Sequence, residues 1–90
     1  MSTLTAVKTD ERVKDVNVTP ETLSVSLLDG RVISVPLFWY PRLFKATEPQ
    51  RNEWETCGGG YGVYWPALDE HLSVEGLLQG APSPELQKNS

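Results

Sequence analysis

The stretch TLSVSLLDGRVISVPL, residues 22–37, decides the fold of this chain. Leucine, valine and isoleucine alternate with serine, threonine and proline on both sides of Asp29-Gly30, a pair that is typical of hairpin turns. Successive side chains of a strand point to opposite faces, so each half of the stretch places its apolar residues on one face. The stretch therefore predicts two antiparallel strands that share an apolar face.

The length of the hairpin loop follows from the same alternation, because directly paired residues lie on the same face of a sheet. A two-residue loop would place Val25 opposite Ser34 and would mix apolar with polar positions. A three-residue loop at residues 28–30 places Val25 opposite Ile33 instead. We therefore predict the three-residue loop, with Gly30 in a left-handed conformation at a bulge.

Further strands are predicted on both sides of the hairpin, at residues 13–18 and 61–65, where apolar and polar side chains again alternate. Between the hairpin and the last strand the period of two is lost, and helices are predicted. Pro41 suits the first turn of a helix, and Thr47 suits the N-cap of a second helix that ends near Glu55. The apolar side chains of this helical segment would cover the apolar face of the sheet.

A short C-terminal helix is predicted over residues 74–79. Ser73 is a favourable N-cap for it, and Gly80 is a favourable residue to end it. The complete order is strand, strand, strand, helix, strand and short helix (β-β-β-α-β, then a helical turn). This order describes an α+β fold in which a small antiparallel β-sheet carries a helical cover on one face.

Ninety residues are enough for one small domain. We expect this domain to span residues 12–80, between a mobile N-terminal segment of residues 1–11 and a disordered tail of residues 81–90. No apolar run approaches the roughly 20 residues that span a bilayer, and the N-terminus is polar from its first residues. The single cysteine, Cys57, fits a reducing compartment, so a cytoplasmic location without membrane contact is expected.

The charge balance is acidic, with twelve acidic and eight basic residues and a net charge of −4. Proteins that bind nucleic acids concentrate basic residues on one face, whereas the basic residues here are scattered singly, so direct DNA binding is not expected. An acidic surface favours basic partners, including other proteins. Arg42 and Arg51 are expected to form ion pairs with the acidic residues of the segment 69–75.

The segment 69–75 holds the densest group of titratable side chains. Asp69, Glu70 and Glu75, together with His71, have the chemistry for general acid–base catalysis or for binding a metal ion. Adjacent residues point in different directions and His71 is the only imidazole, so a shared ion is not favoured. A polar turn before a helix, whose dipole favours negative charge, is the preferred interpretation.

Two other patterns carry weaker signals. The glycines at 58–60 precede a strand and lack the following lysine of a phosphate-binding loop, so nucleotide binding is not indicated. Cys57 with His71 as a base has the composition of a nucleophilic pair, but a packed thiol is the commoner role of a free cysteine. We therefore predict no catalytic residue, no metal site and no cofactor.

Aromatic residues are more numerous than a thin core can enclose, so some are expected at the surface. Exposed aromatic side chains are enriched in protein–protein interfaces. We therefore predict an interaction surface that combines aromatic residues with the acidic segment. Its predicted members are Trp39, Tyr40, Tyr61, Tyr64, Asp69, Glu70, His71 and Glu75.

Five blocks of the sequence occur together in an order that resembles a known bacterial family. The blocks are DGRVISVPL (29–37), YPRL (40–43), RNEWE (51–55), GGGYGVYWP (58–66) and LDEHLSVEGLL (68–78). Over residues 11–82 the chain resembles the bacterial domain of unknown function numbered 2442, although His71 stands where that family more often has an aspartate. The resemblance implies a small cytoplasmic α+β domain. It also implies, for some members, an antitoxin-like role beside a small toxin-like protein, and for others fusion to a helix-turn-helix domain.

These observations favour a non-enzymatic protein-interaction module, an antitoxin-like partner of a small basic protein. The alternative is an accessory or regulatory domain with weak nucleic-acid contact. The third hypothesis is an enzyme with an acidic site at residues 69–75.

Overall fold

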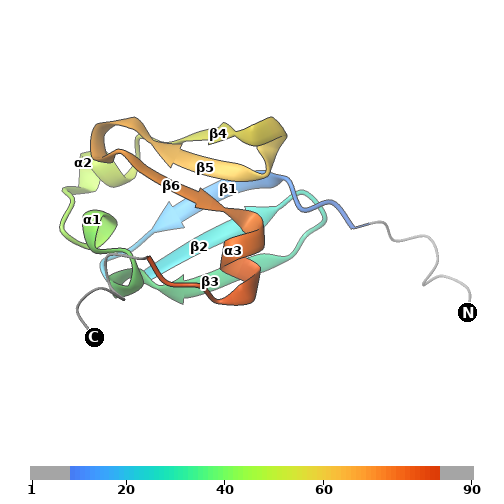
Figure 1. The fold of residues 1–90 in the computed structure, drawn as a ribbon, viewed down its shortest axis with the longest axis horizontal. Coiled ribbons are helices and arrows are strands. Elements are labelled where there is room, and N and C mark those ends of the chain that lie inside the picture. The colour runs from blue at the N-terminus through green and yellow to red at the C-terminus, as the bar shows by residue number, and fades with distance from the viewer. Residues whose placement is uncertain (1–8, 84–90) are drawn as a thin grey trace, which may run out of the picture.

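The structure, a computed structural model, describes residues 9–83, which form two antiparallel sheets and a few short helices in an α+β arrangement (Figure 1). Sheet A contains the strands β1 (Val13–Val18), β2 (Thr22–Leu27) and β3 (Val32–Pro36), in the order β1-β2-β3. Sheet B contains β4 (Glu55–Cys57), β5 (Gly62–Trp65) and β6 (Glu70–Ser73), in the order β4-β5-β6. The α-helices are α1 (Pro41–Phe44), α2 (Glu48–Arg51) and α3 (Val74–Gln79), with 3-10 turns at Leu37–Trp39, Gly58–Gly60 and Pro66–Leu68.

The second sheet differs from the prediction of a single sheet with a helical cover. Sheet B lies beside sheet A in Figure 1, where helices alone were expected. The predicted second helix ends at Arg51 and not near Glu55, and the chain continues into β4. The polar turn predicted before α3 is the strand β6, apart from Asp69 at its start. Both unpredicted strands are short and mostly polar, so no apolar alternation marked them.

The hairpin of β2 and β3 is confirmed in its loop length and register. Val25 pairs with Ile33, as the three-residue loop requires. Leu27 N–H donates to Arg31 O at 2.8 Å across the end of the loop. Gly30 has a φ of 101°, in the left-handed half of backbone space that was predicted for it. The apolar face of this hairpin is therefore fixed by its turn.

The helix boundaries are confirmed where local chemistry predicted them. Pro41 is the first residue of α1. Thr47 caps α2: its hydroxyl oxygen accepts from Gln50 N–H, and Oε1 of Gln50 accepts from Thr47 N–H, which completes a capping box. Ser73 caps α3, and Gly80 ends it with a φ of 72°.

The core lies between the two sheets and includes side chains from both, with contributions from α1 and α3. The apolar residues of the hairpin lie in one core cluster with side chains of sheet B and of the segment after β3, and the predicted helical cover on one face of a single sheet is not confirmed. In the helical segment, Trp54 is partly buried against the core, whereas Phe44 is exposed. The buried side chains are Val13, Val16, Leu23, Val25, Leu27, Val35, Leu37, Tyr40, Leu43, Val63, Trp65, Leu72, Val74 and Leu77.

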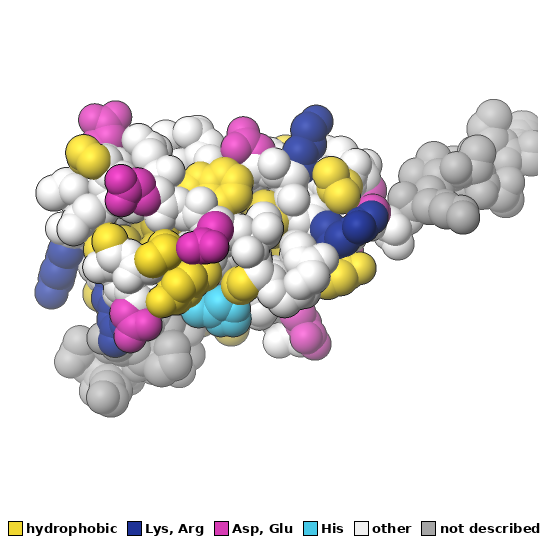
Figure 2. All heavy atoms as spheres, turned by 90° about the horizontal axis from the view of Figure 1, so that it is seen from above, with side chains coloured by type: hydrophobic (Ala, Val, Ile, Leu, Met, Phe, Trp, Pro, Cys, Tyr) yellow, Lys and Arg dark blue, Asp and Glu magenta, His cyan; other side chains and the backbone are white. Residues whose placement is uncertain are grey.

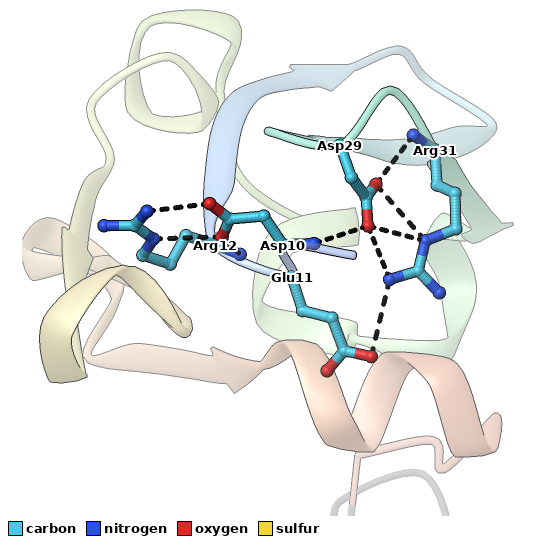
Figure 3. Close-up of polar contacts among 5 residues, drawn as sticks. All are labelled: Asp10, Glu11, Arg12, Asp29 and Arg31. Atoms are coloured by element: carbon cyan, nitrogen blue, oxygen red, sulfur yellow. Dashed lines mark hydrogen bonds and ion pairs between the residues drawn. The ribbon is translucent and has the colours of Figure 1, made fainter. Parts of the chain in front are cut away.

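An ion-pair network joins the residues before β1 to the hairpin loop (Figure 3). The carboxylate of Asp29 accepts hydrogen bonds from Asp10 N–H at 2.9 Å and from Nη2 of Arg31 at 2.8 Å. Nη2 of Arg31 also lies 3.4 Å from Oε2 of Glu11. Nη2 of Arg12 forms an ion pair with Oδ2 of Asp10 at 2.7 Å. The start of the described chain is thus held to the loop by charged groups.

The last described residues also contact the domain. Ser83 is buried, and its N–H donates to Trp39 O at 3.0 Å. The predictions of a mobile N-terminal segment and a disordered tail fall largely on residues 1–8 and 84–90, which lie outside the described residues.

Replacing Gly30 with alanine tests the turn. Because a φ of 101° is unfavourable for a residue with a Cβ, Gly30→Ala is expected to lower the free energy of unfolding by about 1–3 kcal/mol. Among the described residues, no atom beyond the two chain neighbours of Gly30 lies within 4 Å of the added Cβ. A loss of stability in urea denaturation therefore reports backbone strain and not a clash. The exposed Leu28→Ala in the same loop is the control, with an expected change within about 0.5 kcal/mol. Equal stability of Gly30→Ala and wild type would contradict the turn.

The pH dependence of stability tests the network at Asp29. The guanidinium of Arg31 and the N–H groups of Asp10 and Arg31 hold the pKa of the Asp29 carboxyl well below its usual value. A lowered folded-state pKa stabilises the fold above the unfolded pKa of about 3.9, and this contribution is lost as the pH falls. We expect Asp29→Asn to be less stable than wild type at neutral pH and to lose less stability on acidification.

The measurement is urea denaturation at several pH values from about 7 to about 2. The control is Glu21→Gln, which removes an exposed carboxylate in the turn between β1 and β2, outside the network, and should keep the wild-type pH profile. Identical profiles for wild type and Asp29→Asn would contradict a stabilising role of the network.

Candidate functional site

The pairing of β5 with its two neighbours sets which side chains of sheet B face outward. Val63 and Trp65 are buried and face the core, so the alternate positions of β5 face away from it. The outer face of sheet B then consists of two rows across the strands, Glu55–Tyr64–His71 and Cys57–Gly62–Ser73.

Charge is distributed very unevenly between the two halves of the described chain. Residues 9–51 contain six acidic and six basic residues and are neutral overall. Residues 52–83, which supply sheet B and α3, contain five acidic residues and neither lysine nor arginine. Figure 2 views the molecule from the side of sheet B: acidic and hydrophobic side chains mingle there around the single histidine, and Lys and Arg lie toward the edges. Of these five acidic residues, Glu53, Glu55, Asp69 and Glu75 are exposed and Glu70 is buried, and Glu55 belongs to the two rows of the outer face.

The structure places the predicted surface residues in three different environments. Tyr61 is 53% exposed, whereas Tyr40 is 2% and Glu70 8% exposed. The prediction that Tyr40 and Glu70 lie at the surface is therefore wrong. Glu70 is buried because it stands at an inward position of β6, opposite Trp65. Asp69, His71 and Glu75 are exposed, and Trp39 and Tyr64 are half-buried.

Only part of the predicted surface is brought together. Tyr64 and His71 are direct cross-strand partners on the outer face of sheet B. Val74 N–H donates to Tyr61 O at 2.9 Å, which makes the Tyr64–His71 pair a non-hydrogen-bonded one, where side chains approach most closely. Trp39 lies in the 3-10 turn after β3 and is not part of this face.

Glu55 belongs to the face and was not predicted, because β4 was not recognised as a strand. The absence of lysine and arginine from residues 52–83 is the sequence signal that marks it.

The acidic segment is attached to the helical segment by one of the two predicted arginine contacts. Nη1 of Arg42 donates to Asp69 O at 2.7 Å and lies 3.8 Å from the Asp69 carboxylate. Asp69 itself has a φ of 52°, which turns the chain into β6. Arg51 makes no such pair and instead donates to Leu43 O at 3.0 Å and to Phe44 O at 2.8 Å.

Comparison with known proteins identifies the family. Residues 13–83 match the family described as "Protein of unknown function (DUF2442)". The chain belongs to the DUF2442 family. The resemblance of the five sequence blocks is therefore confirmed. No match was found among curated proteins.

Two solved structures are similar to this DUF2442 domain. The first is the crystal structure of a protein of unknown function from Rhodospirillum rubrum, with a TM-score of 0.69 and 27% identity over 83% of this chain and 93% of that chain. The second is the solution NMR structure of an uncharacterised protein from Chromobacterium violaceum, with a TM-score of 0.69 and 26% identity over 80% of this chain and 68% of that chain. The fold is thus shared by proteins whose activity is also unassigned.

The potential catalytic and metal-binding groups of the DUF2442 domain do not converge. Within residues 9–83, no group of three or more histidine, cysteine, aspartate and glutamate side chains is placed to hold a metal ion. In the same range, no helix has the length and apolar character needed to cross a membrane.

Cys57 and His71 both place their side chains beside Gly62. A Cβ at Gly62 would lie 3.0 Å from Sγ of Cys57, 3.2 Å from Nε2 of His71 and 3.3 Å from Leu72 O. The thiol and the imidazole therefore pack over a position that only glycine fills without a shift.

A mutant cycle tests this packing. Gly62→Ala is expected to destabilise the domain by about 1–3 kcal/mol, because the added methyl group overpacks the outer face of sheet B. In a Cys57→Ala background the cost of Gly62→Ala should fall by at least about 0.5 kcal/mol in urea denaturation. Thr56→Ala, on the other side of β4, is the control and should be additive with Gly62→Ala. Additivity of Gly62→Ala with Cys57→Ala would contradict the arrangement.

Proposed function

We propose that this DUF2442 domain is a non-enzymatic protein-interaction module that binds a basic partner protein through the outer face of sheet B. The observation that carries this proposal is the charge separation, since residues 52–83 hold five acidic residues and no lysine or arginine. Such a surface attracts a partner of opposite charge and orients it during association.

Aromatic side chains beside the acidic ones support the same role. Tyr61 is exposed and lines a shallow hollow with Glu11 and Glu75. Tyr64 stands between Glu55 and His71 on the outer face of sheet B. Tyrosine offers apolar contact area at low entropic cost and also receives cations over its ring. Acidic and aromatic groups together suit a surface rich in lysine and arginine.

The partner that fits this surface is a small basic protein, and an antitoxin-like role in the cytoplasm is the finer form of the proposal. Its support is the excess negative charge of sheet B and α3, together with the antitoxin-like role that family resemblance implied. In this role the domain acts by covering a basic surface of its partner.

Nucleic-acid contact and catalysis are less well supported. Arg12, Arg31, Arg42 and Arg51 all donate hydrogen bonds within the chain, which reduces their capacity to neutralise phosphates. An acidic catalytic site would need converging groups, yet Glu70 points inward while its neighbours Asp69 and His71 are exposed. Both functions therefore rank below protein binding.

Charge reversal tests the proposed function. The tagged chain with Glu55→Lys and Glu75→Lys should recover about tenfold less of its partner from host cells than wild type, because like charges now meet at the interface. The matched control, Asp15→Lys with Glu21→Lys, changes the net charge equally but leaves sheet B untouched and should recover the wild-type amount. Recovery is measured by quantitative mass spectrometry at about 0.15 M salt. Equal loss with both pairs, or an acidic partner, would contradict the proposal.

A further inference from the structure

A cavity of about 270 Å³ opens between β6, α3 and residues 81–83. Its lining includes the apolar Leu72 and Leu77 together with the carboxylate of Glu70 and the ring of Tyr40. Among residues 9–83, neither lysine nor arginine lines it. The volume is below the roughly 300–1,000 Å³ of cavities that enclose drug-sized ligands, so it suits a single side chain.

The cavity is continuous with the proposed binding surface. His71 and Ser73 line it and also belong to the outer face of sheet B. A partner bound to the outer face of sheet B would therefore place its own side chains at the mouth of the cavity.

Glu70 gives the cavity a buried carboxyl group. It stands opposite Trp65 in the β5–β6 pairing and is 8% exposed. Burial raises the pKa of Tyr40, and the charge of nearby Glu70 raises it further. The Tyr40 hydroxyl donates to Ala81 O at 3.2 Å, which fixes the ring at the cavity wall. A carboxylate presents about four acceptor positions, and Glu70 already takes part in an interaction within the chain, so an arriving guanidinium would use the acceptor positions that remain.

We propose that this cavity, the Glu70 cavity, receives an arginine side chain of the basic partner. The proposal rests on the proposed function and names its anchoring residue. Arginine has an apolar stem for Leu72 and Leu77 and a cationic head for Glu70. Its guanidinium is less strongly hydrated than the ammonium of lysine, stacks on aromatic rings and binds a carboxylate through two parallel hydrogen bonds. These properties suit a half-closed cavity with a carboxylate and a tyrosine.

The experiment is a titration of the full chain, labelled with ¹⁵N, by blocked arginine (N-acetyl-arginine amide), followed by NMR. Amide signals of Ser73, Gly76 and Leu77 should shift in a saturable way, with a dissociation constant on the order of 1 mM. Blocked citrulline has the same shape without the charge and should produce no saturable shift. Blocked lysine should bind at least about threefold more weakly.

Variants then assign the binding to Glu70. Glu70→Gln should weaken the binding of blocked arginine about tenfold or more, while the exposed Glu48→Gln, outside the cavity, should leave it unchanged. The comparison of arginine with citrulline needs only the wild-type chain. It therefore shows whether binding requires the guanidinium charge even where Glu70→Gln does not fold.

Three results would overturn the proposal: no saturable shift, binding of lysine equal to that of arginine, or shifts unaffected by Glu70→Gln in a folded protein. Shifts confined to the outer face of sheet B would overturn the Glu70 cavity and leave the proposed function standing. Conversely, saturable arginine binding in the cavity, with partner recovery insensitive to charge reversal, would refute the proposed function alone.

Discussion

The burial of Trp65 between the two sheets is the interaction on which the other features depend. Its side chain is fully enclosed, and its indole N–H donates to Arg51 O at 3.0 Å, so the polar group is paired where water is excluded. The guanidinium of Arg51 in turn donates to Leu43 O and Phe44 O at the end of α1. One tryptophan and one arginine thus join sheet B to both helices that follow sheet A. With Trp65 pointing inward, the parity of β5 leaves Tyr64 on the outer face.

The same parity carries Glu70 inward, and this position costs stability. Removing a carboxylate from water is unfavourable unless hydrogen bonds and charges around it compensate. Among the described residues no buried side-chain nitrogen or oxygen lacks a hydrogen-bond partner, so the domain does compensate. An apolar residue opposite Trp65 would need no such arrangement. A carboxyl group kept at a core-facing position is the kind of local inconsistency that marks a functional site.

The sequence predicted those parts of the fold that local chemistry determines. The loop around Gly30 followed from the parity of apolar positions, and the caps at Thr47 and Ser73 followed from side chains that bond their own neighbouring backbone. The strands β4 and β6 could not be found in this way. β4 is an edge strand without a buried side chain, and β6 contains one buried apolar residue, Leu72, so their existence depends on pairing with β5.

The contrast between features set by local chemistry and features set by tertiary packing also explains which members of the interaction surface were predicted correctly. Exposed acidic residues near a helix start were predictable, because Asp69 and Glu75 lie at turns and caps where the backbone leaves side chains in solvent. The exposure of Tyr40 and Glu70 was mispredicted, since it depends on which face each element turns to the core. Charge segregation is a property of the whole chain and connects these observations. Residues 52–83 contain no lysine or arginine of their own, and Arg42 of the helical segment pairs with Asp69 across the two halves. A partner that supplies basic groups would balance the acidic side chains of this segment.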